Sequence, residues 1–286
     1  MTTDPRVSII IRTYNRPKML RRALESVGRQ TYKNIEAVVI NDAGQDVQSI
    51  VDDFKNDFDI LYLNYPPEDK PGRCKAANEG IAQSTGEWIC YLDDDDFYYP
   101  DHIAVLMHEA RRTGALVHYT DANRGTEEPS SVPGEYVITA VGEGPSEDFS
   151  RAGFYCGCYI HLVTFCHHRR LFEELGGFDE NLPVLEDLDL FFRYAFDNEF
   201  HHIKQKTAQF QIRTDQTNAV TSMRLEFAET HELLCKKYLH TAVGDMMVLI
   251  QEGRARLLGT ASILEDLMVR ISTLEHRILE LEQRDR

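Results

Sequence analysis

Four consecutive aspartates, Asp93 to Asp96, directly follow the apolar segment at residues 87–92. Adjacent carboxylates repel one another, so such a run is stable only where positive charge lies nearby. An acidic run is most often a solvated surface loop. This one follows a stretch that predicts a buried strand, which favours a binding role. Carboxylate oxygens suit Mg²⁺ or Mn²⁺, and such an ion commonly joins a protein carboxylate to a substrate diphosphate.

A second acidic pair, Glu186 and Asp187, lies just after Pro183 at the start of a predicted helix. Acidic residues are favoured at a helix N-terminus in any case, because they complement the helix dipole, and that explanation stays open. A carboxylate within hydrogen-bond reach of a substrate hydroxyl can also accept its proton. The pair is therefore a candidate general base.

Tyr14 and Asp42 end the first two predicted strands. A tyrosine ring can stack on a nucleobase, and a carboxylate can accept a hydrogen bond from the base. The alternatives are a tyrosine that closes the edge of the core and an aspartate in a turn. Arg73, Lys75 and Arg213 are either solvated cations or contacts for a diphosphate.

These candidate residues require a scaffold that brings strand ends together. In the first 105 residues, apolar segments that predict strands alternate with segments that predict helices. The predicted strands cover residues 7–15, 35–44, 60–64 and 87–92, and the predicted helices begin at Pro17 and cover residues near 47–54 and 76–83. This alternation predicts a parallel α/β sheet, in which ligands bind at the carboxyl ends of strands. Tyr14, Asp42 and the aspartates all follow such ends.

The second part of the sequence has less regular patterns. Residues 123–151 are rich in Gly, Pro, Ser and Glu, which predicts a hairpin or a long loop. Residues 160–168 predict a strand, residues 171–175 a short helix ended by two glycines, and residues 187–196 a further helix.

Composition restricts the class of protein. The chain of 286 residues is 42% hydrophobic, which is ordinary for a globular protein, and its 47 acidic and 31 basic residues give a net charge of −16. Such a surface repels nucleic acid and anionic lipid. With a polar start and no stretch of about 18 apolar residues, we expect a cytoplasmic protein, or one peripheral to the inner face of a membrane.

The six cysteines are scattered and are interpreted as reduced thiols. A zinc site could be imagined from Cys156, Cys158, Cys166 and His167. Their spacing matches no paired C-x-x-C pattern, so zinc is the less favoured interpretation.

The last segment has a heptad pattern, because apolar residues at 264, 267, 271, 274, 278 and 281 alternate three and four residues apart. The pattern indicates a short coiled coil, through which the chain would form a homo-oligomer or bind a partner helix at residues 264–281. The alternative is an amphipathic helix packed on its own domain. The expected domains are residues 1–240, with a nucleotide-binding half at 1–105 and an acceptor and catalytic-base half at 106–240, and a helical tail at 241–286.

The order of the motifs is more specific than any one of them. TYNRP after the first strand, then INDAGQD, GRCKAANEG, STGEWICYLDDDD and GGFDENLPVLEDLDLFFR, resembles the motif series of the family-2 glycosyltransferases with the GT-A fold. The match covers roughly residues 7 to 220. It implies an α/β fold with a mostly parallel central sheet flanked by helices, to which a C-terminal helical tail is added here.

The resemblance implies roles in donor binding. Tyr14 would stack on the nucleobase, with Arg12 and Thr13 lining the same pocket. Asp42 would contact the edge of the base, commonly uracil in this family, and Asp94 would lie near the ribose.

The resemblance also implies the catalytic positions. Asp93 and Asp95 would be the outer aspartates of the D-x-D motif, with Asp95 the direct ligand of Mn²⁺ or Mg²⁺. Asp187 would be the general base, with Glu186 beside it. Arg213 falls near a position where relatives place a His or Arg that touches the metal or the diphosphate. The implied chemistry is a single displacement that inverts the anomeric carbon.

Some positions depart from the family pattern. Asn41 replaces the first acid of V-D-D-G-S, Ala43-Gly44-Gln45 replaces G-S-T, Ala77 replaces the arginine of A-R-N, and Arg12 replaces a smaller residue. These departures weaken an assignment of the nucleotide and leave the metal and base positions unchanged.

The sequence therefore predicts an inverting glycosyltransferase that moves a sugar from a nucleotide diphosphate, expected to be UDP, to a hydroxyl of a glycan or lipid-linked glycan. By analogy with the family, we expect a role in bacterial surface polysaccharide synthesis. A second hypothesis is a non-catalytic module that binds a nucleotide sugar or glycan and oligomerises through its tail. A third, a nucleotidyltransferase, is disfavoured because RTYNRP has no glycine-rich phosphate loop.

Overall fold

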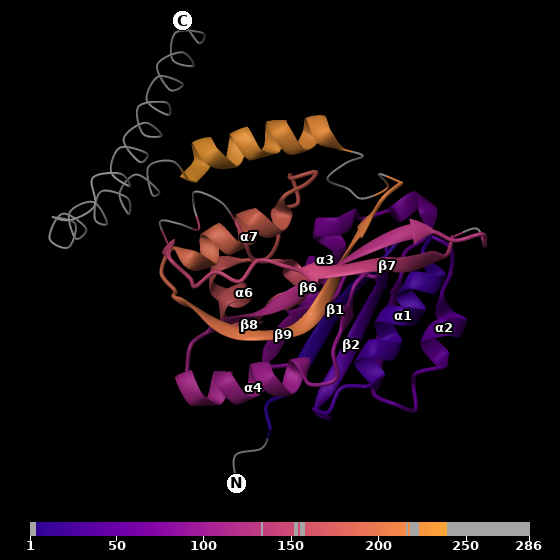
Figure 1. The fold of residues 1–286 in the computed structure, drawn as a ribbon, viewed down its shortest axis with the longest axis horizontal. Coiled ribbons are helices and arrows are strands. Elements are labelled where there is room, and N and C mark those ends of the chain that lie inside the picture. Colours follow the sequence, from indigo (N-terminus) through magenta and orange to yellow (C-terminus); the bar gives the residue numbers. More distant parts are fainter. Residues whose placement is uncertain are drawn as a thin grey trace, which may run out of the picture. The chain divides into compact units, whose positions relative to one another are not determined.

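The computed structural model describes residues 4–132, 134–151, 154, 158–215, 217 and 223–238. The described residues belong to one compact unit that ends at Tyr238 (Figure 1). The expected tail at 241–286, with its heptad pattern, lies outside the described residues, and so does Cys156. Within the described part of the chain, no helix is both long and apolar enough to cross a bilayer.

The first half of the unit is the predicted parallel sheet. Its strands are β1 (Val7–Thr13), β2 (Ile35–Asn41), β3 (Asp59–Asn64) and β4 (Trp88–Tyr91), in the order β3-β2-β1-β4. Its helices are α1 (Pro17–Gly28), α2 (Gln48–Asp52) and α3 (Arg73–Gln83), with a 3-10 turn at Pro67–Asp69. β2 is buried along its whole length, as its continuous apolar run predicts. The four strands and three helices were expected from the sequence, and the 3-10 turn was not.

The sheet continues in mixed orientation through the second half. β8 (Phe165–His168) is antiparallel to β4, and β6 (Val117–Pro129) is antiparallel to β8. β9 (Phe200–Arg213) is parallel to β6, and β5 (Phe97–Tyr98) is antiparallel to β9. β7 (Tyr136–Glu143) pairs with β6 as the hairpin predicted in residues 123–151. The α/β architecture expected from the family resemblance is confirmed.

Some second-half elements differ from the sequence prediction. The strand expected at 160–168 begins only at Phe165, after a 3-10 turn at Leu162–Thr164. α6 (Arg169–Leu175) and α7 (Glu186–Ala195) lie close to their predicted positions. α4 (His102–Thr113), β9 and a helix at residues 224–238 had not been predicted. β9 was missed because its polar residues lack the period-two pattern of a half-buried strand.

The two faces of the sheet carry separate apolar clusters, because successive strand side chains point in opposite directions. Ile9 and Ile11 of β1 pack in one cluster with residues of α1 and α4. Ile10 lies in the other cluster, with residues of α3, α6 and α7. Helices therefore cover both faces of the sheet (Figure 1). This arrangement leaves the carboxyl edge of β1, β2 and β4 for polar side chains.

Gly80 shows how closely α3 packs on the sheet. A Cβ atom built at Gly80 would lie 2.6 Å from Cδ1 of Ile40, which is too close for any real contact. At Gly28, the last residue of α1, a Cβ would lie 3.6 Å from the Phe58 ring, an ordinary distance. The absence of a side chain at Gly80 therefore allows α3 to pack directly against Ile40 of β2.

We predict that Gly80→Ala lowers the free energy of unfolding by about 1–3 kcal/mol, because the methyl group overpacks the interface between α3 and β2. Gly28→Ala is the matched control and should leave stability unchanged or raise it by up to about 1 kcal/mol. Urea unfolding measures both. Equal stability of the two variants would contradict the packing argument.

Candidate active site

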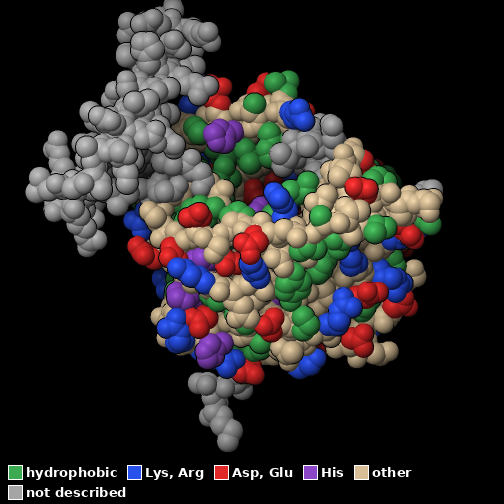
Figure 2. Space-filling model, viewed as in Figure 1, with side chains coloured by type: hydrophobic (Ala, Val, Ile, Leu, Met, Phe, Trp, Pro, Cys, Tyr) green, Lys and Arg blue, Asp and Glu red, His purple; other side chains and the backbone are tan. Residues whose placement is uncertain are grey.

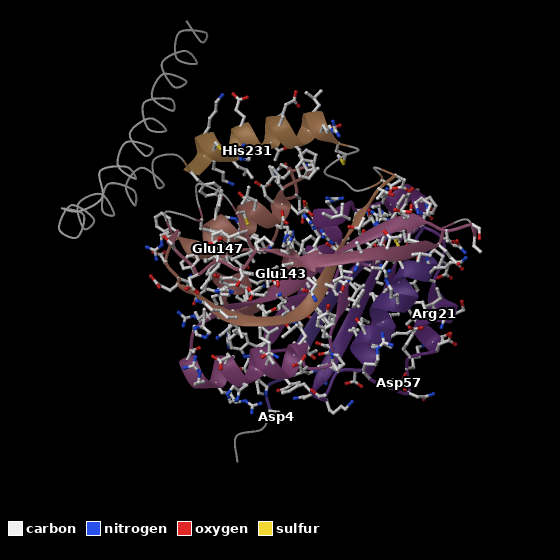
Figure 3. The ribbon with its side chains drawn as sticks, viewed as in Figure 1. Asp4, Arg21, Asp57, Glu143, Glu147 and His231 are labelled. Atoms are coloured by element: carbon white, nitrogen blue, oxygen red, sulfur yellow. The ribbon has the colours of Figure 1, made fainter. Side chains whose placement is uncertain are left out.

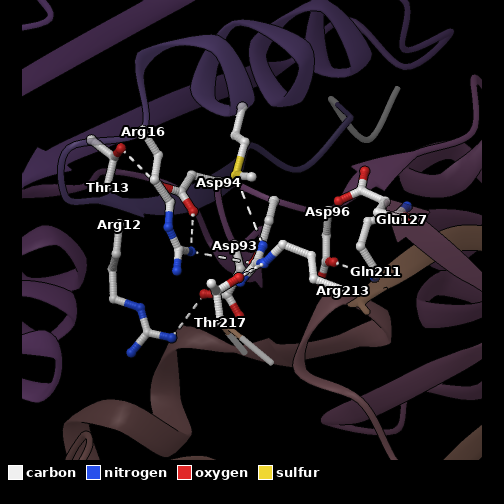
Figure 4. A network of polar contacts seen from close by, with 12 residues as sticks. Arg12, Thr13, Arg16, Asp93, Asp94, Asp96, Glu127, Gln211, Arg213 and Thr217 are labelled. Carbon is white, nitrogen blue, oxygen red and sulfur yellow. Dashed lines mark hydrogen bonds and ion pairs between the residues drawn. The ribbon is translucent and has the colours of Figure 1, made fainter. Parts of the chain in front are cut away.

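The aspartate run lies at the carboxyl edge of the parallel strands, as the sequence predicts. It follows β4, which pairs directly with β1. Thr13, at the end of β1, donates a hydrogen bond from Oγ1 to Oδ2 of Asp94 at 2.8 Å. Figure 4 shows these side chains converging from separate strands. On the surface, Figure 2 shows a hollow with acidic side chains at its base, whereas elsewhere on that face basic and acidic side chains are interspersed.

Arginines supply the positive charge that the run requires. Arg16 Nη1 lies 3.1 Å from Oδ1 of Asp94 and 3.2 Å from Oδ2 of Asp95. Arg213 Nη1, from the end of β9, lies 2.6 Å from the same Oδ2 of Asp95. The Arg213 side chain is only 2% exposed, so its pairing with Asp95 is weakly screened by solvent. The structure thus brings Arg213 to the aspartate run, while its expected contact with a metal or diphosphate stays a prediction, and Arg16 had not been recognised.

Arg12 of β1 joins the two candidate catalytic regions. Its Nη2 lies 2.9 Å from Oδ1 of Asp93, and its Nη1 lies 2.9 Å from Oε1 of Glu186. These partners are 81 and 174 residues away in sequence. Burial opposes the charge of Arg12, but the two carboxylates outweigh it and raise the pKa of the guanidinium above its ordinary value. Arg73, at the start of α3, adds a weaker contact at 3.6 Å to Glu186 Oε2.

Glu186 and Asp187 begin α7 in different environments. Glu186 is 4% exposed and paired with Arg12. Asp187 is half-buried and accepts a hydrogen bond from its neighbour Leu188 N at 2.8 Å. Burial and the charge of Glu186 raise the pKa of Asp187 to about 6, with a smaller contribution from Asp93. A carboxylate with this pKa is ionised at neutral pH and can accept a proton.

The pKa values of Asp93, Asp94 and Asp96 are shifted in different directions because their contacts differ. Burial raises the pKa of Asp93, but Arg12 outweighs this effect and holds it below the ordinary value. Burial and the charge of Asp95 raise the pKa of Asp94 to about 7. Burial and the charges of Asp95 and Asp93 raise the pKa of Asp96 well above its ordinary range. Asp96 accepts a hydrogen bond from Gln211 N of β9 at 2.9 Å, so it ties the run to that strand.

The residues expected at the nucleobase lie at the same sheet edge. The Tyr14 side chain is 46% exposed, and Lys70 Nζ lies 3.7 Å from its ring centroid. Asp42 is buried and accepts a hydrogen bond from Gly72 N at 2.8 Å. Asn41, which replaces the family's acid, bonds the backbone of the following turn, where its Nδ2 donates to the carbonyl of Gln45 at 3.0 Å.

One further feature of the site was not anticipated. Arg22 of α1 donates to the backbone carbonyl of Asp95 and to the fully buried Glu127 of β6, and so holds the aspartate turn from behind. Lys75 was expected either to be solvated or to contact a diphosphate. It is exposed and pairs with Glu79 on its own helix at 3.8 Å, whereas its neighbour Arg73 turns toward Glu186.

The carboxylates of Asp93 and Asp95 fit a hard divalent cation only together with oxygen ligands from a substrate. Asp93 and Asp95 present carboxylates at one edge, and no group of three or more metal-binding side chains is found in the described residues. Mg²⁺ and Mn²⁺ are commonly held by one or two carboxylates plus phosphate oxygens. Of the imagined zinc set, His167 is engaged with the hydroxyl of Tyr91 at 2.8 Å.

The chain has clear relatives. A family model described as "Glycosyl transferase family 2" matches residues 8–159. The chain is 29% identical over 201 residues to the putative colanic acid biosynthesis glycosyl transferase WcaA of Escherichia coli, covering 68% of this chain and 67% of WcaA.

Two solved structures share the fold. TarS residues 1–349 of S. aureus, in complex with UDP-GlcNAc, matches 73% of this chain and 59% of that chain with a TM-score of 0.59 and 17% identity. The mannosyltransferase PcManGT of Pyrobaculum calidifontis, in complex with GDP-Man and Mn²⁺, matches 96% of this chain and 81% of that chain with a TM-score of 0.57 and 16% identity. Because the family model matches residues 8–159, more than half of its length, this chain belongs to glycosyl transferase family 2.

Proposed function

We propose that this protein is a metal-dependent, inverting glycosyltransferase. The observation that carries the proposal is the Arg12 bridge, which brings the aspartate run and the start of α7 to one place. Carboxylates suited to a metal and a half-buried carboxylate suited to accept a proton thereby share one site. This pairing is what transfer of a sugar from a diphosphate to a hydroxyl requires.

The proposed donor is a nucleotide diphosphate sugar, with UDP as the first choice. The exposed ring of Tyr14 offers a surface for the base once Lys70 moves aside. Asp42 lies at the neighbouring strand end, and Asp94 would approach the ribose. The complex of TarS with UDP-GlcNAc supports this choice of donor.

Asp95 and Asp93 are proposed to hold Mn²⁺ or Mg²⁺, as the Mn²⁺ complex of PcManGT supports. The ion supplies charge neutralisation on the departing diphosphate. Arg16 and Arg213 already contact Asp95, so their guanidinium groups are placed to meet diphosphate oxygens as well. Arg73 and Lys75 lie at the start of the helix that faces the same edge.

In the proposed reaction, Asp187 accepts the proton of the acceptor hydroxyl. The hydroxyl oxygen attacks the anomeric carbon, and the bond from that carbon to the diphosphate oxygen breaks with its electron pair on the oxygen. Configuration inverts because attack and departure occur on opposite faces. Glu186 is held by Arg12 and positions its neighbour, so Asp187 is the one proposed as base.

The proposed acceptor is a hydroxyl of a glycan or lipid-linked glycan in bacterial surface polysaccharide synthesis, at the cytoplasmic side of the membrane. The similarity to WcaA supports this class of acceptor. We also propose that the chain divides into a domain at residues 1–240 and a tail at residues 241–286. Association through residues 264–281 is a further proposal.

We predict that Asp187→Asn lowers kcat by at least about 100-fold, because an amide cannot accept the proton. For the wild type, kcat should fall as pH falls through about 6, since protonation removes the base. Initial rates of sugar transfer across pH 5–8 measure both. Asp197→Asn, at an exposed position after α7, is the control. An Asp187→Asn variant as fast as the control would contradict the assignment.

We predict that Asp95→Ala abolishes the Mn²⁺-dependent part of UDP binding, because the ion loses its direct ligand. Titration calorimetry with UDP, with and without Mn²⁺, measures the effect, and the exposed Asp57→Ala is the control. Unchanged binding would remove the metal role of Asp95. Binding of nucleotide sugars by the wild type without transfer or donor hydrolysis would favour the scaffold hypothesis over an enzyme.

We predict that Arg12→Met lowers the free energy of unfolding by about 2–3 kcal/mol, because it removes the ion pair of Asp93 and leaves buried Glu186 with only the longer contact to Arg73. Adding Glu186→Gln should restore part of the loss. The exposed pair of Arg21 and Asp53 offers a control, for which Arg21→Met should change stability by less than about 0.5 kcal/mol. Urea unfolding measures both variants. If Arg12→Met lost no more free energy of unfolding than Arg21→Met, the Arg12 bridge would be unimportant for stability.

A further inference from the structure

Asp189 lies on α7 two residues after Asp187 and is fully buried. Its carboxylate receives three donors. Arg193 Nε lies 2.8 Å from Oδ2, while Lys237 Nζ at 2.8 Å and the hydroxyl of Tyr238 at 2.7 Å both bond Oδ1. Burial opposes the charge of Asp189, but Lys237, Arg193 and Tyr238 together hold its pKa below the ordinary value. The carboxylate is therefore anionic at neutral pH.

Two of these donors come from outside α7. Lys237 and Tyr238 are the last described residues of the helix at residues 224–238, which lies beside α7 in Figure 1 and carries the label of His231 in Figure 3. Arg193 comes from α7 itself and also donates to the carbonyl of Leu175 at 2.8 Å, at the end of α6. Arg193 alone would balance the charge of Asp189. The contacts of Lys237 and Tyr238 thus serve to attach the later helix to α7.

Apolar and ionic contacts strengthen this attachment. Leu234 is fully buried, and the Tyr238 ring packs edge-on against Phe192 of α7 with centroids 5.3 Å apart. Lys237 Nζ also lies 3.7 Å from Oδ2 of Asp179, which precedes α7. The attachment therefore joins α7, the segment before it and the helix at 224–238.

The start of α7 needs such external contacts. Three acidic residues, Glu186, Asp187 and Asp189, fall in its first turn, where their charges repel one another. Leu185 caps the helix in the left-handed conformation at φ 57°, which is unfavourable for a leucine, and no side chain caps the helix by a hydrogen bond. Arg12 holds Glu186 on one side. The contacts at Asp189 hold the other side, so Asp187 lies between two fixed carboxylates.

We propose that Lys237 and Tyr238 form a latch on Asp189 that positions the first turn of α7, and with it Asp187. This inference rests on the proposed role of Asp187 as base. Lys237, Tyr238 and Asp189 are positioning residues, because they act through Asp187 and do not touch the substrate. A displacement of about 1 Å at a reacting group can lower a rate by up to about 100-fold, so a loosened latch reduces turnover without removing the base.

The test uses the full-length chain with Lys237→Met, Tyr238→Phe and the double variant. Lys236→Met is the matched control, because Lys236 lies on the same helix, is exposed, and pairs with Glu232 instead. We expect kcat to fall about tenfold in the double variant, with the KM for the donor within twofold of wild type. Lys237→Arg should keep most of the kcat that Lys237→Met loses, because arginine is also a cationic donor. Amide hydrogen exchange at residues 186–190 should be faster in the double variant than in Lys236→Met.

Asp189→Asn would not test the latch alone, because it also removes the buried carboxylate that pairs with Arg193. If the double variant matches Lys236→Met in kcat and in exchange at residues 186–190, the latch is wrong. A joint fall in kcat, donor binding and thermal stability, with no rescue by Lys237→Arg, would also overturn it in favour of a structural role. If the wild type transfers no sugar from any donor, the proposed function fails, and hydrogen exchange still decides whether the latch fixes α7.

Discussion

The mutual repulsion of carboxylates at one sheet edge is the constraint on which the rest of this structure depends. Four aspartates follow β4, and the acidic first turn of α7 lies close to them through the Arg12 bridge. Arg12, Arg16 and Arg213 come from three separate segments to balance this charge. In a chain with a net charge of −16, these cations offset the repulsion among the clustered carboxylates.

The same contacts give each carboxylate its own chemistry. Asp93 and Asp95 are paired with arginines at an edge suited to a diphosphate and its metal, while Asp96 is occupied by the backbone of β9. Glu186 is buried against Arg12, and Asp187 beside it keeps a pKa of about 6. The two adjacent acids thus differ in their electrostatic environment, because Glu186 is paired with Arg12 and Asp187 is not in an ion pair with it.

Much of the site could be predicted from the sequence, because its signals are local. The apolar run before Asp93, the motif order and the acidic pair at 186–187 identify the sheet edge and the family. Arg16, Arg22 and Lys70 were missed, since an arginine or lysine beside a turn has no pattern that separates a solvated side chain from a paired one. The sequence left Lys75 open between a solvated cation and a diphosphate contact, and the structure shows it paired with Glu79 one turn away on its own helix.

By itself, the sequence determined the parallel half of the sheet, the positions of the acidic motifs and the membership of glycosyl transferase family 2. These depend on hydrophobic periodicity and on residue types in short segments. Only the tertiary structure decided that Arg12 spans from Asp93 to Glu186, that Arg213 reaches Asp95, and that Lys237 and Tyr238 hold Asp189. These pairs join residues tens to hundreds of positions apart. Their formation depends on how the strands and helices pack, which no local pattern encodes.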